Sequence, residues 1–169
     1  MTPERAAYHY LMLSAGQREE FDRDFDEALE REDPLSDLMV QLCGAPPSDI
    51  NACRSVLMNY YVDHTVDGEK VYDLVWQDLR RRWQSGMPDA ELANLAWSIQ
   101  MEAEDRWDAD WEELRELSYA LEYWMESTIT EERFRWCLQE YFTTKICPDP
   151  LPPVPARKSL LQRLNDALK

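Results

Sequence analysis

The stretch that decides the fold spans residues 69–84 and reads EKVYDLVWQDLRRRWQ. Its apolar side chains Val71, Val75, Leu79 and Trp83 recur every fourth residue, with charged and polar residues among the positions between them. This spacing places the four on one face of an α-helix, because about 3.6 residues complete a turn. The stretch therefore predicts an amphipathic helix that packs on a core through one side.

The residues just before this helix permit a second interpretation. β-Branched residues flank Asp67-Gly68, a dipeptide that is typical of β-hairpin turns. A short hairpin over residues 60–76 is therefore the alternative to a helix that begins near Glu69. The regular apolar spacing that starts at Val71 favours the helix.

Helical periodicity extends over most of the chain on both sides of this stretch. Capping residues and breakers mark the predicted boundaries. These boundaries are Thr2-Pro3 and Gly16 for the first helix, Asp33-Pro34 and Gly44 for the third, Ser48 for the start of the fourth, Gly86 and Pro88 after the fifth, and Thr128 with Glu131 for the eighth. Thr128 and Glu131 have the spacing of a capping box.

The sequence thus predicts an all-α fold, either a single-domain multi-helix bundle or a short stack of helical hairpins, over residues 1–147. A proline-rich connector, residues 148–158, follows this acidic helical domain. Ser159 then caps a C-terminal amphipathic helix over residues 159–169, whose apolar residues share one face. These apolar residues are Leu160, Leu161, Leu164, Ala167 and Leu168.

Charge is strongly unbalanced along the chain. The net charge is −16, made up of −18 in residues 1–147 and +2 in residues 148–169. An acidic domain repels the phosphate backbone, so we expect no direct nucleic-acid binding and instead a basic protein partner. No apolar run reaches membrane-spanning length, so we expect no membrane contact and a cytoplasmic protein.

Motifs of catalysis are missing from the sequence. The two histidines, His9 and His64, belong to no metal-binding motif, and no P-loop, dinucleotide fingerprint or G-x-S-x-G occurs. We expect His9 to be a hydrogen-bonded structural histidine. The four cysteines include no C-x-x-C, and we expect them to be reduced, buried apolar fillers.

One loop resembles a calcium-binding loop only in part. Asp63, Thr65, Asp67 and Gly68 occupy its first, third, fifth and sixth positions, but Leu74 stands where a bidentate Glu is needed. We therefore predict no metal site and no cofactor. The basic run at residues 80–82 is expected to form ion pairs with neighbouring acidic helices.

Two segments are candidates for partner binding. The first is the acidic stretch EAEDRWDADWEE at residues 102–113, which is either a solvated helix end or a docking patch with tryptophan anchors. The solvated helix end is the favoured interpretation. Its candidate residues are Glu102, Glu104, Asp105, Trp107, Asp108, Asp110 and Trp111.

The second segment is the proline-rich connector. Pro152, Pro155 and Arg157 fit a polyproline ligand of SH3 domains, although a stiff linker is the favoured interpretation. The amphipathic helix after it could also support self-association through the C-terminal tail.

The leading functional hypothesis is a non-enzymatic interaction protein that engages a basic partner. A toxin-neutralising or nuclease-inhibiting protein would belong to this class, because carboxylates can occupy a phosphate-binding groove. The alternatives are a carboxylate-based metal or hydrolytic enzyme built in the bundle, or a structural subunit of a larger assembly.

Overall fold

The computed structural model describes residues 1–32, 34–46, 48–107 and 111–151, with the side chains of residues 106 and 107 excepted. Eight helices and no strand occur in these residues. The helices are α1 (Pro3–Ser14), α2 (Glu19–Arg31), α3 (Asp37–Gly44), α4 (Ile50–Val62), α5 (Gly68–Gln84), α6 (Asp89–Trp107), α7 (Glu112–Met125) and α8 (Glu131–Thr144). The all-α prediction is confirmed. The predicted helix over residues 159–169 lies outside the described residues.

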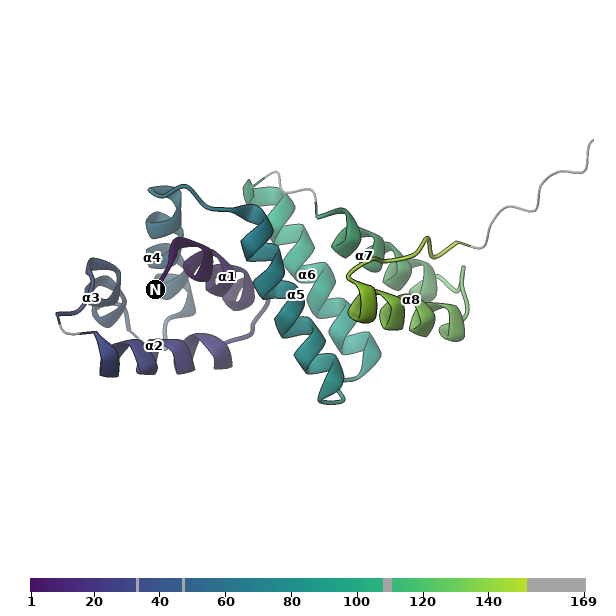
Figure 1. Ribbon diagram of the computed structural model, residues 1–169, viewed down its shortest axis with the longest axis horizontal. Helices are drawn as coiled ribbons and strands as arrows, with labels where there is room; N and C mark the ends of the chain where they lie inside the picture. The colour runs from purple at the N-terminus through teal and green to yellow at the C-terminus, as the bar shows by residue number, and fades with distance from the viewer. Residues whose placement is uncertain (33, 47, 108–110, 152–169) are drawn as a thin grey trace, which may run out of the picture.

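The helices follow one another along an elongated molecule (Figure 1). Helices α1 to α4 form one end, α5 and α6 cross the middle, and α7 and α8 form the other end. Helix α1 packs against α4, α5 and α6. Its residues 6–13 are all buried, as expected for a helix that is surrounded by others.

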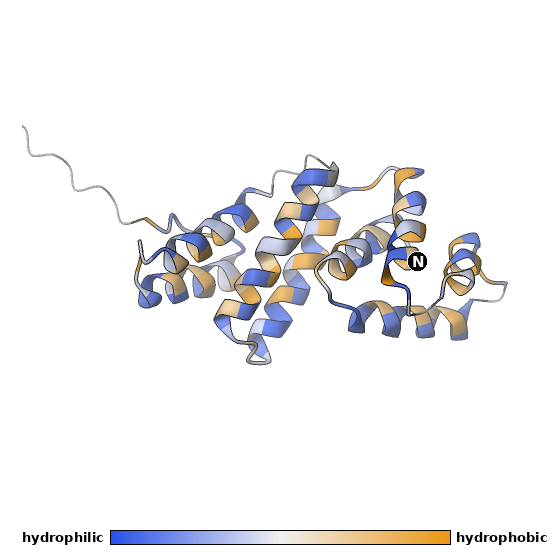
Figure 2. Ribbon diagram, turned by 180° about the vertical axis from the view of Figure 1, so that it is seen from behind, coloured by the Kyte–Doolittle hydropathy of each residue, from blue (hydrophilic) through white to orange (hydrophobic). Residues whose placement is uncertain are grey.

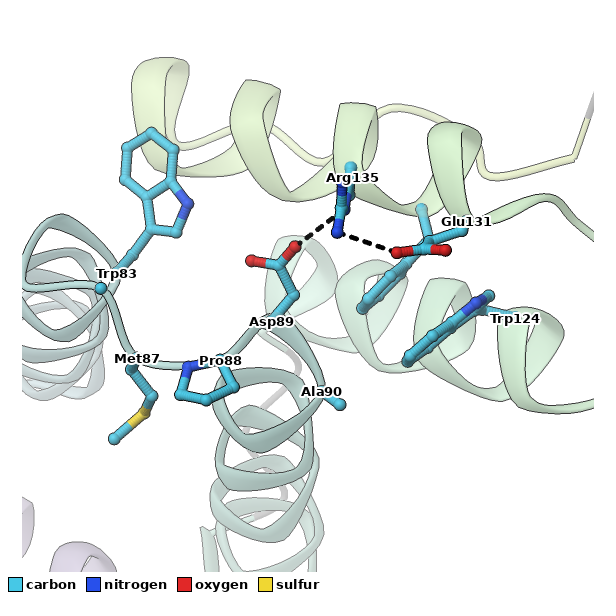
Figure 3. Close-up of a pocket in the computed structure, with 10 residues that line it drawn as sticks. Trp83, Met87, Pro88, Asp89, Ala90, Trp124, Glu131 and Arg135 are labelled. Atoms are coloured by element: carbon cyan, nitrogen blue, oxygen red, sulfur yellow. Dashed lines mark ion pairs between the residues drawn. The ribbon is translucent and has the colours of Figure 1, made fainter.

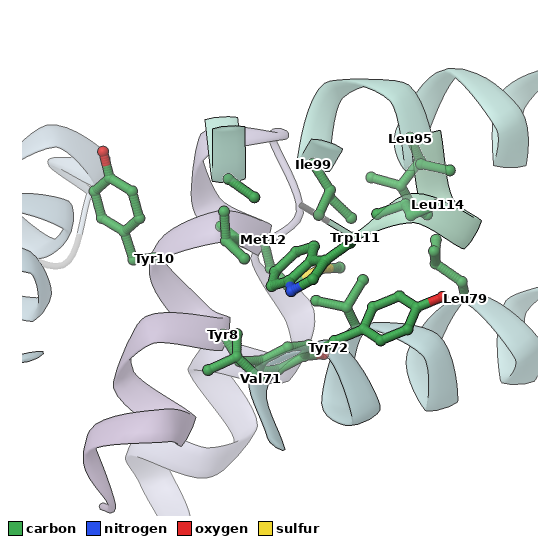
Figure 4. Close-up of a cluster of buried hydrophobic side chains, with 14 of the residues drawn as sticks. Tyr8, Tyr10, Met12, Val71, Tyr72, Leu79, Leu95, Ile99, Trp111 and Leu114 are labelled. Atoms are coloured by element: carbon green, nitrogen blue, oxygen red, sulfur yellow. The ribbon is translucent and has the colours of Figure 1, made fainter. Parts of the chain in front are cut away.

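Most of the other helices turn one apolar side inward and a charged side outward (Figure 2). Val71, Val75 and Leu79 of α5 are fully or almost fully buried, which confirms the face predicted from their spacing. Figure 4 shows how α5 joins the core: Tyr72 lies beside Trp111, with Leu79, Leu95 and Ile99 in the same cluster. A single apolar core therefore runs from α1 through α5 and α6 to α7.

Three tight turns between consecutive helices end the preceding helix in the same way, with a residue in the left-handed conformation. After α1, Gly16 takes a left-handed φ of 76° and the N–H of Gln17 donates to the Met12 carbonyl oxygen over 2.7 Å. Gly86 has φ 87° after α5, and Ser127 has φ 61° after α7. This Schellman closure satisfies the last carbonyl groups of each helix and returns the chain at once. The fold is thus assembled largely from helical hairpins.

The region that could have been a hairpin is helical. Asp67 is the N-cap of α5, where its carboxylate accepts hydrogen bonds from the N–H groups of Glu69 and Lys70 at 3.1 and 3.4 Å. The hairpin alternative is wrong because these bonds start a helix at Gly68, directly after Asp67. The Asp67 carboxylate of the calcium-like loop is thereby used as a helix cap.

Three predicted helix starts are corrected. Thr130, not Thr128, caps α8 by accepting the Arg133 N–H at 3.2 Å, while the Thr128 N–H closes the end of α7. Asp49 rather than Ser48 caps α4. The third helix begins at Asp37, three residues beyond Pro34. In each case several cap-forming residues lie close together, and sequence spacing does not choose among them.

The basic run of α5 pairs within the molecule, as predicted. An Nη atom of Arg81 lies 2.8 Å from a Glu20 carboxylate oxygen of α2, and Arg82 Nε lies 2.7 Å from Asp78. The guanidinium of Arg80 lies over the Trp76 ring at 5.0 Å. Only the Arg81–Glu20 pair joins α5 to acidic α2, whereas the contacts of Arg80 and Arg82 named here lie within α5.

Candidate partner-binding face

Helix α6 exposes two large apolar side chains on its outer surface. Trp97 is 48% exposed and Met101 is 43% exposed, and the two are one helical turn apart. Glu104 and Asp105, which are also exposed, follow them at the next turn. Positions i, i+4, i+7 and i+8 lie on one side of a helix, so these four side chains form one surface. We call Trp97, Met101, Glu104 and Asp105 the α6 face.

The other side of α6 explains why this face is outward. Leu92, Ala96, Ile99 and Ala103 are all fully buried and pack into the core. Helix α6 contacts α7, α1 and α5 through that side. Helix α6 therefore has a buried apolar side and an exposed side that is also partly apolar.

Glu102, one of the predicted binding residues, has partners inside the molecule. The Tyr10 hydroxyl donates to its carboxylate over 2.5 Å, and an Nη atom of Arg54 lies 3.5 Å from the same oxygen. The Arg54 guanidinium also lies over the Tyr10 ring, 5.2 Å from its centre. Glu102 therefore joins α6 to α1 and α4 at the edge of the α6 face.

Trp111, predicted as an anchor for a partner, is buried. The residue is only 5% exposed, and its ring stacks on Tyr72 with 5.4 Å between ring centres (Figure 4). A partner cannot reach such a side chain without disrupting the core. The structure thus separates Trp111 from Glu104 and Asp105, which are exposed.

The remaining predicted residues lie outside the described part of the chain. This applies to Asp108, Asp110, Pro152, Pro155 and Arg157, and to the side chain of Trp107. Trp97 was not predicted as a binding residue, because the prediction followed the density of carboxylates along the chain and Trp97 lies before the acidic stretch. Helical spacing from Met101 and Glu104 was the signal that could have found it.

A cleft of about 470 Å³ opens where the α5–α6 turn faces the start of α8 (Figure 3). Trp83, Met87, Trp124 and Phe134 are among its apolar lining, and Trp124 stacks on Phe134 at 4.6 Å between ring centres. Aromatic walls of this kind suit an apolar or cationic side chain.

A chain of ion pairs crosses this cleft. Arg135 lies between two carboxylates, with Nε 3.3 Å from Asp89 and an Nη atom 2.8 Å from Glu131 (Figure 3). The arginine is well exposed, so both pairs are screened by water and can exchange partners. The cleft therefore carries one negative charge more than positive, in keeping with the acidic surface.

His9 forms a buried pair with Asp24. Its Nε2 lies 3.0 Å from Asp24 Oδ2, and Arg5 Nε donates to the same oxygen over 2.5 Å. Burial lowers the pKa of His9, so the imidazole is neutral near pH 7. Burial alone would raise the pKa of Asp24, but the hydrogen bonds from His9 and Arg5 outweigh it and lower the pKa. This geometry agrees with a structural histidine.

Among the described residues, no group of three or more His, Cys, Asp or Glu side chains is placed to hold a metal ion. The same residues include no helix long and apolar enough to cross a membrane. Comparison with protein families, with curated proteins and with solved structures finds no match to this chain.

Proposed function

We propose that this protein is a non-enzymatic interaction module whose α6 face binds a basic amphipathic helix of a partner protein. The observation that carries the proposal is the exposure of Trp97 and Met101 directly beside Glu104 and Asp105. Tryptophan is enriched among the residues that dominate binding energy, and carboxylates at its rim select a cationic partner. A basic amphipathic helix presents both an apolar stripe and lysine or arginine side chains.

The energy available from Trp97 supports a specific contact. A tryptophan offers up to about 250 Å² of surface, so a half-exposed one has about 120 Å² left to bury. At about 25 cal/mol per Å², burying it contributes about 3 kcal/mol, or about a hundredfold in affinity. The carboxylates raise the association rate and make binding depend on salt, because residues 1–147 carry a net charge of −18 and attract cations at long range.

A defined peptide pair tests the proposal. The full-length protein is titrated by calorimetry with a Leu/Lys amphipathic peptide of about 18 residues, and in parallel with a Leu/Glu peptide of the same pattern. We expect the Leu/Lys peptide to bind and the Leu/Glu peptide not to bind. Added salt should weaken the binding, because screening reduces the attraction between Lys and carboxylate.

Matched tryptophan variants locate the site. Trp97→Ala should weaken binding of the Leu/Lys peptide by about 10- to 100-fold. Trp136→Ala is the control, because Trp136 is similarly exposed, at 38%, but lies on α8. Equal losses in the two variants, or equal affinity for both peptides, would contradict the proposed face.

A further inference from the structure

The chain reverses direction after α8 and returns along it. Lys145 adopts a left-handed φ of 65°, which ends the helix and turns the chain. Arg133 of α8 then holds the returning segment, with Nη2 2.6 Å from the Asp149 carbonyl oxygen and Nε 3.2 Å from that of Pro150. We call residues 146–151 the C-terminal strap.

The strap brings together two thiols that are ten residues apart in sequence. Cys137 lies on α8 and Cys147 on the strap, and both are buried and reduced. Each sulfur lies 3.8 Å from the same acceptor, the carbonyl oxygen of Pro148. The backbone N–H of Cys147 donates to Glu113 of α7, so the strap is attached to both helices of this hairpin.

The environment differentiates the two sulfurs. A hydrogen bond from the Cys147 thiol, assisted by the charge of Arg133, outweighs burial and lowers the pKa of Cys137. The pKa of Cys147 is raised, because its thiol is the donor in that bond and is itself buried. Cys137 is therefore the thiol that ionises more readily, while the neighbouring Cys147 keeps its proton, as in a reactive dithiol.

We propose that Cys137 and Cys147 form a reversible disulfide that fastens the strap to α8, with a hydroperoxide as the oxidant. The Cys137 thiol gives up its proton, its sulfur attacks one peroxide oxygen and the O–O bond breaks. The other oxygen takes up that proton and leaves as an alcohol or water. Cys147 sulfur then attacks the Cys137 sulfenic acid, and its hydroxyl departs as water with the Cys147 proton. The two thiols lose two electrons in total and the peroxide gains them. A dithiol reductant reverses the bond by thiol exchange.

The other cysteines provide internal comparisons. Cys43 is exposed on α3, so the expectation that all four cysteines are buried is wrong for this one. Cys53 is buried on α4, where burial raises the pKa of its thiol. Ile146 and Leu151 of the C-terminal strap lie at the surface, so the strap can open locally while the helices stay folded. Such an opening lets the hydroperoxide reach the buried Cys137 sulfur. Pairing of Cys137 and Cys147 thus precedes any reaction that requires the whole domain to unfold.

Peptide mapping tests this proposal directly. The full-length protein is treated with hydrogen peroxide, alkylated and digested with trypsin, which leaves Cys137 in peptide 136–145 and Cys147 in peptide 146–157. We expect these two peptides to be joined, with a mass ~2 Da below the sum of the two thiol peptides. Reduction before alkylation should separate them.

Two serine variants define the specificity. Cys53→Ser should retain the joined peptides, whereas Cys147→Ser should lose them and accumulate a sulfenic acid on Cys137 that a dimedone probe labels. Recovery of peptides 136–145 and 146–157 as alkylated thiols, under conditions that fully oxidise Cys43, would overturn the proposal. So would joining of Cys137 to Cys43 or Cys53 in the folded protein.

Discussion

The buried carboxylate of Asp78 provides a sharp test of how the helices are held together. Asp78 lies on α5 with its side chain almost entirely buried, and it pairs with both Arg81 and Arg82. Arg82 in turn donates to the Gln17 side chain in the α1–α2 turn over 2.8 Å. Replacing Asp78 by Ala removes the carboxylate with which the guanidinium groups of Arg81 and Arg82 pair.

The exposure of the two arginines determines the expected cost. Arg82 is 13% exposed, and removing one partner of a buried pair costs about 3–5 kcal/mol. Arg81 is 51% exposed and also pairs with Glu20, so its lost contact adds at most about 1 kcal/mol. The Arg82 contribution dominates, and Asp78→Ala should lower the free energy of unfolding by about 4 kcal/mol.

A matched control lies on the same helix. Asp73 of α5 pairs with Lys145, but its side chain is 54% exposed, so Asp73→Ala should cost no more than about 1 kcal/mol. Urea denaturation followed by tryptophan fluorescence measures both variants. With an m-value of about 2 kcal/mol/M, Asp78→Ala should lower the midpoint by about 2 M. Midpoints of the two variants within about 0.5 M of each other would refute the reasoning.

Four further predictions rest on burial, on shifted pKa values and on one buried hydrogen bond. Trp111→Ala should cost about 3–5 kcal/mol of unfolding free energy by leaving a core cavity, whereas Trp97→Ala should cost no more than about half of that, because 48% of Trp97 is already exposed. In the folded state the pKa of His9 is lowered from 6.5, so the unfolded chain takes up a proton first and the melting temperature should fall as pH drops from about 7 to 5; this step should shrink in His9→Gln. The lowered pKa of Asp24 stabilises the fold above its ordinary value of 3.8, so a second loss is expected as pH falls below about 4, and a flat profile there would contradict it. Tyr141→Phe should lower the free energy of unfolding by about 1 kcal/mol, because it removes the buried hydrogen bond between the hydroxyl groups of Tyr141 and Tyr72, which lie 3.1 Å apart.

Local chemistry in the sequence determined most of the helical architecture. The regular spacing of Val71, Val75 and Leu79 gave α5 its buried face, and Thr2-Pro3 and Gly16 bounded α1 where they were expected to. These signals are legible because caps and periodicity act within one or two turns of chain. Where several cap-forming residues are neighbours, as at Thr128 and Thr130, the sequence does not choose, because each could cap a helix that starts at the residue after it.

Only the tertiary structure decided which tryptophans are exposed and which cysteines meet. Trp111 lies beside a dense acidic run in the sequence, yet Tyr72 of α5 covers it, while Trp97 remains open because no described helix packs on that side of α6. Cys137 and Cys147 meet because the chain turns back after α8. Periodicity reveals which residues share a face, but burial depends on neighbouring elements that are distant in sequence.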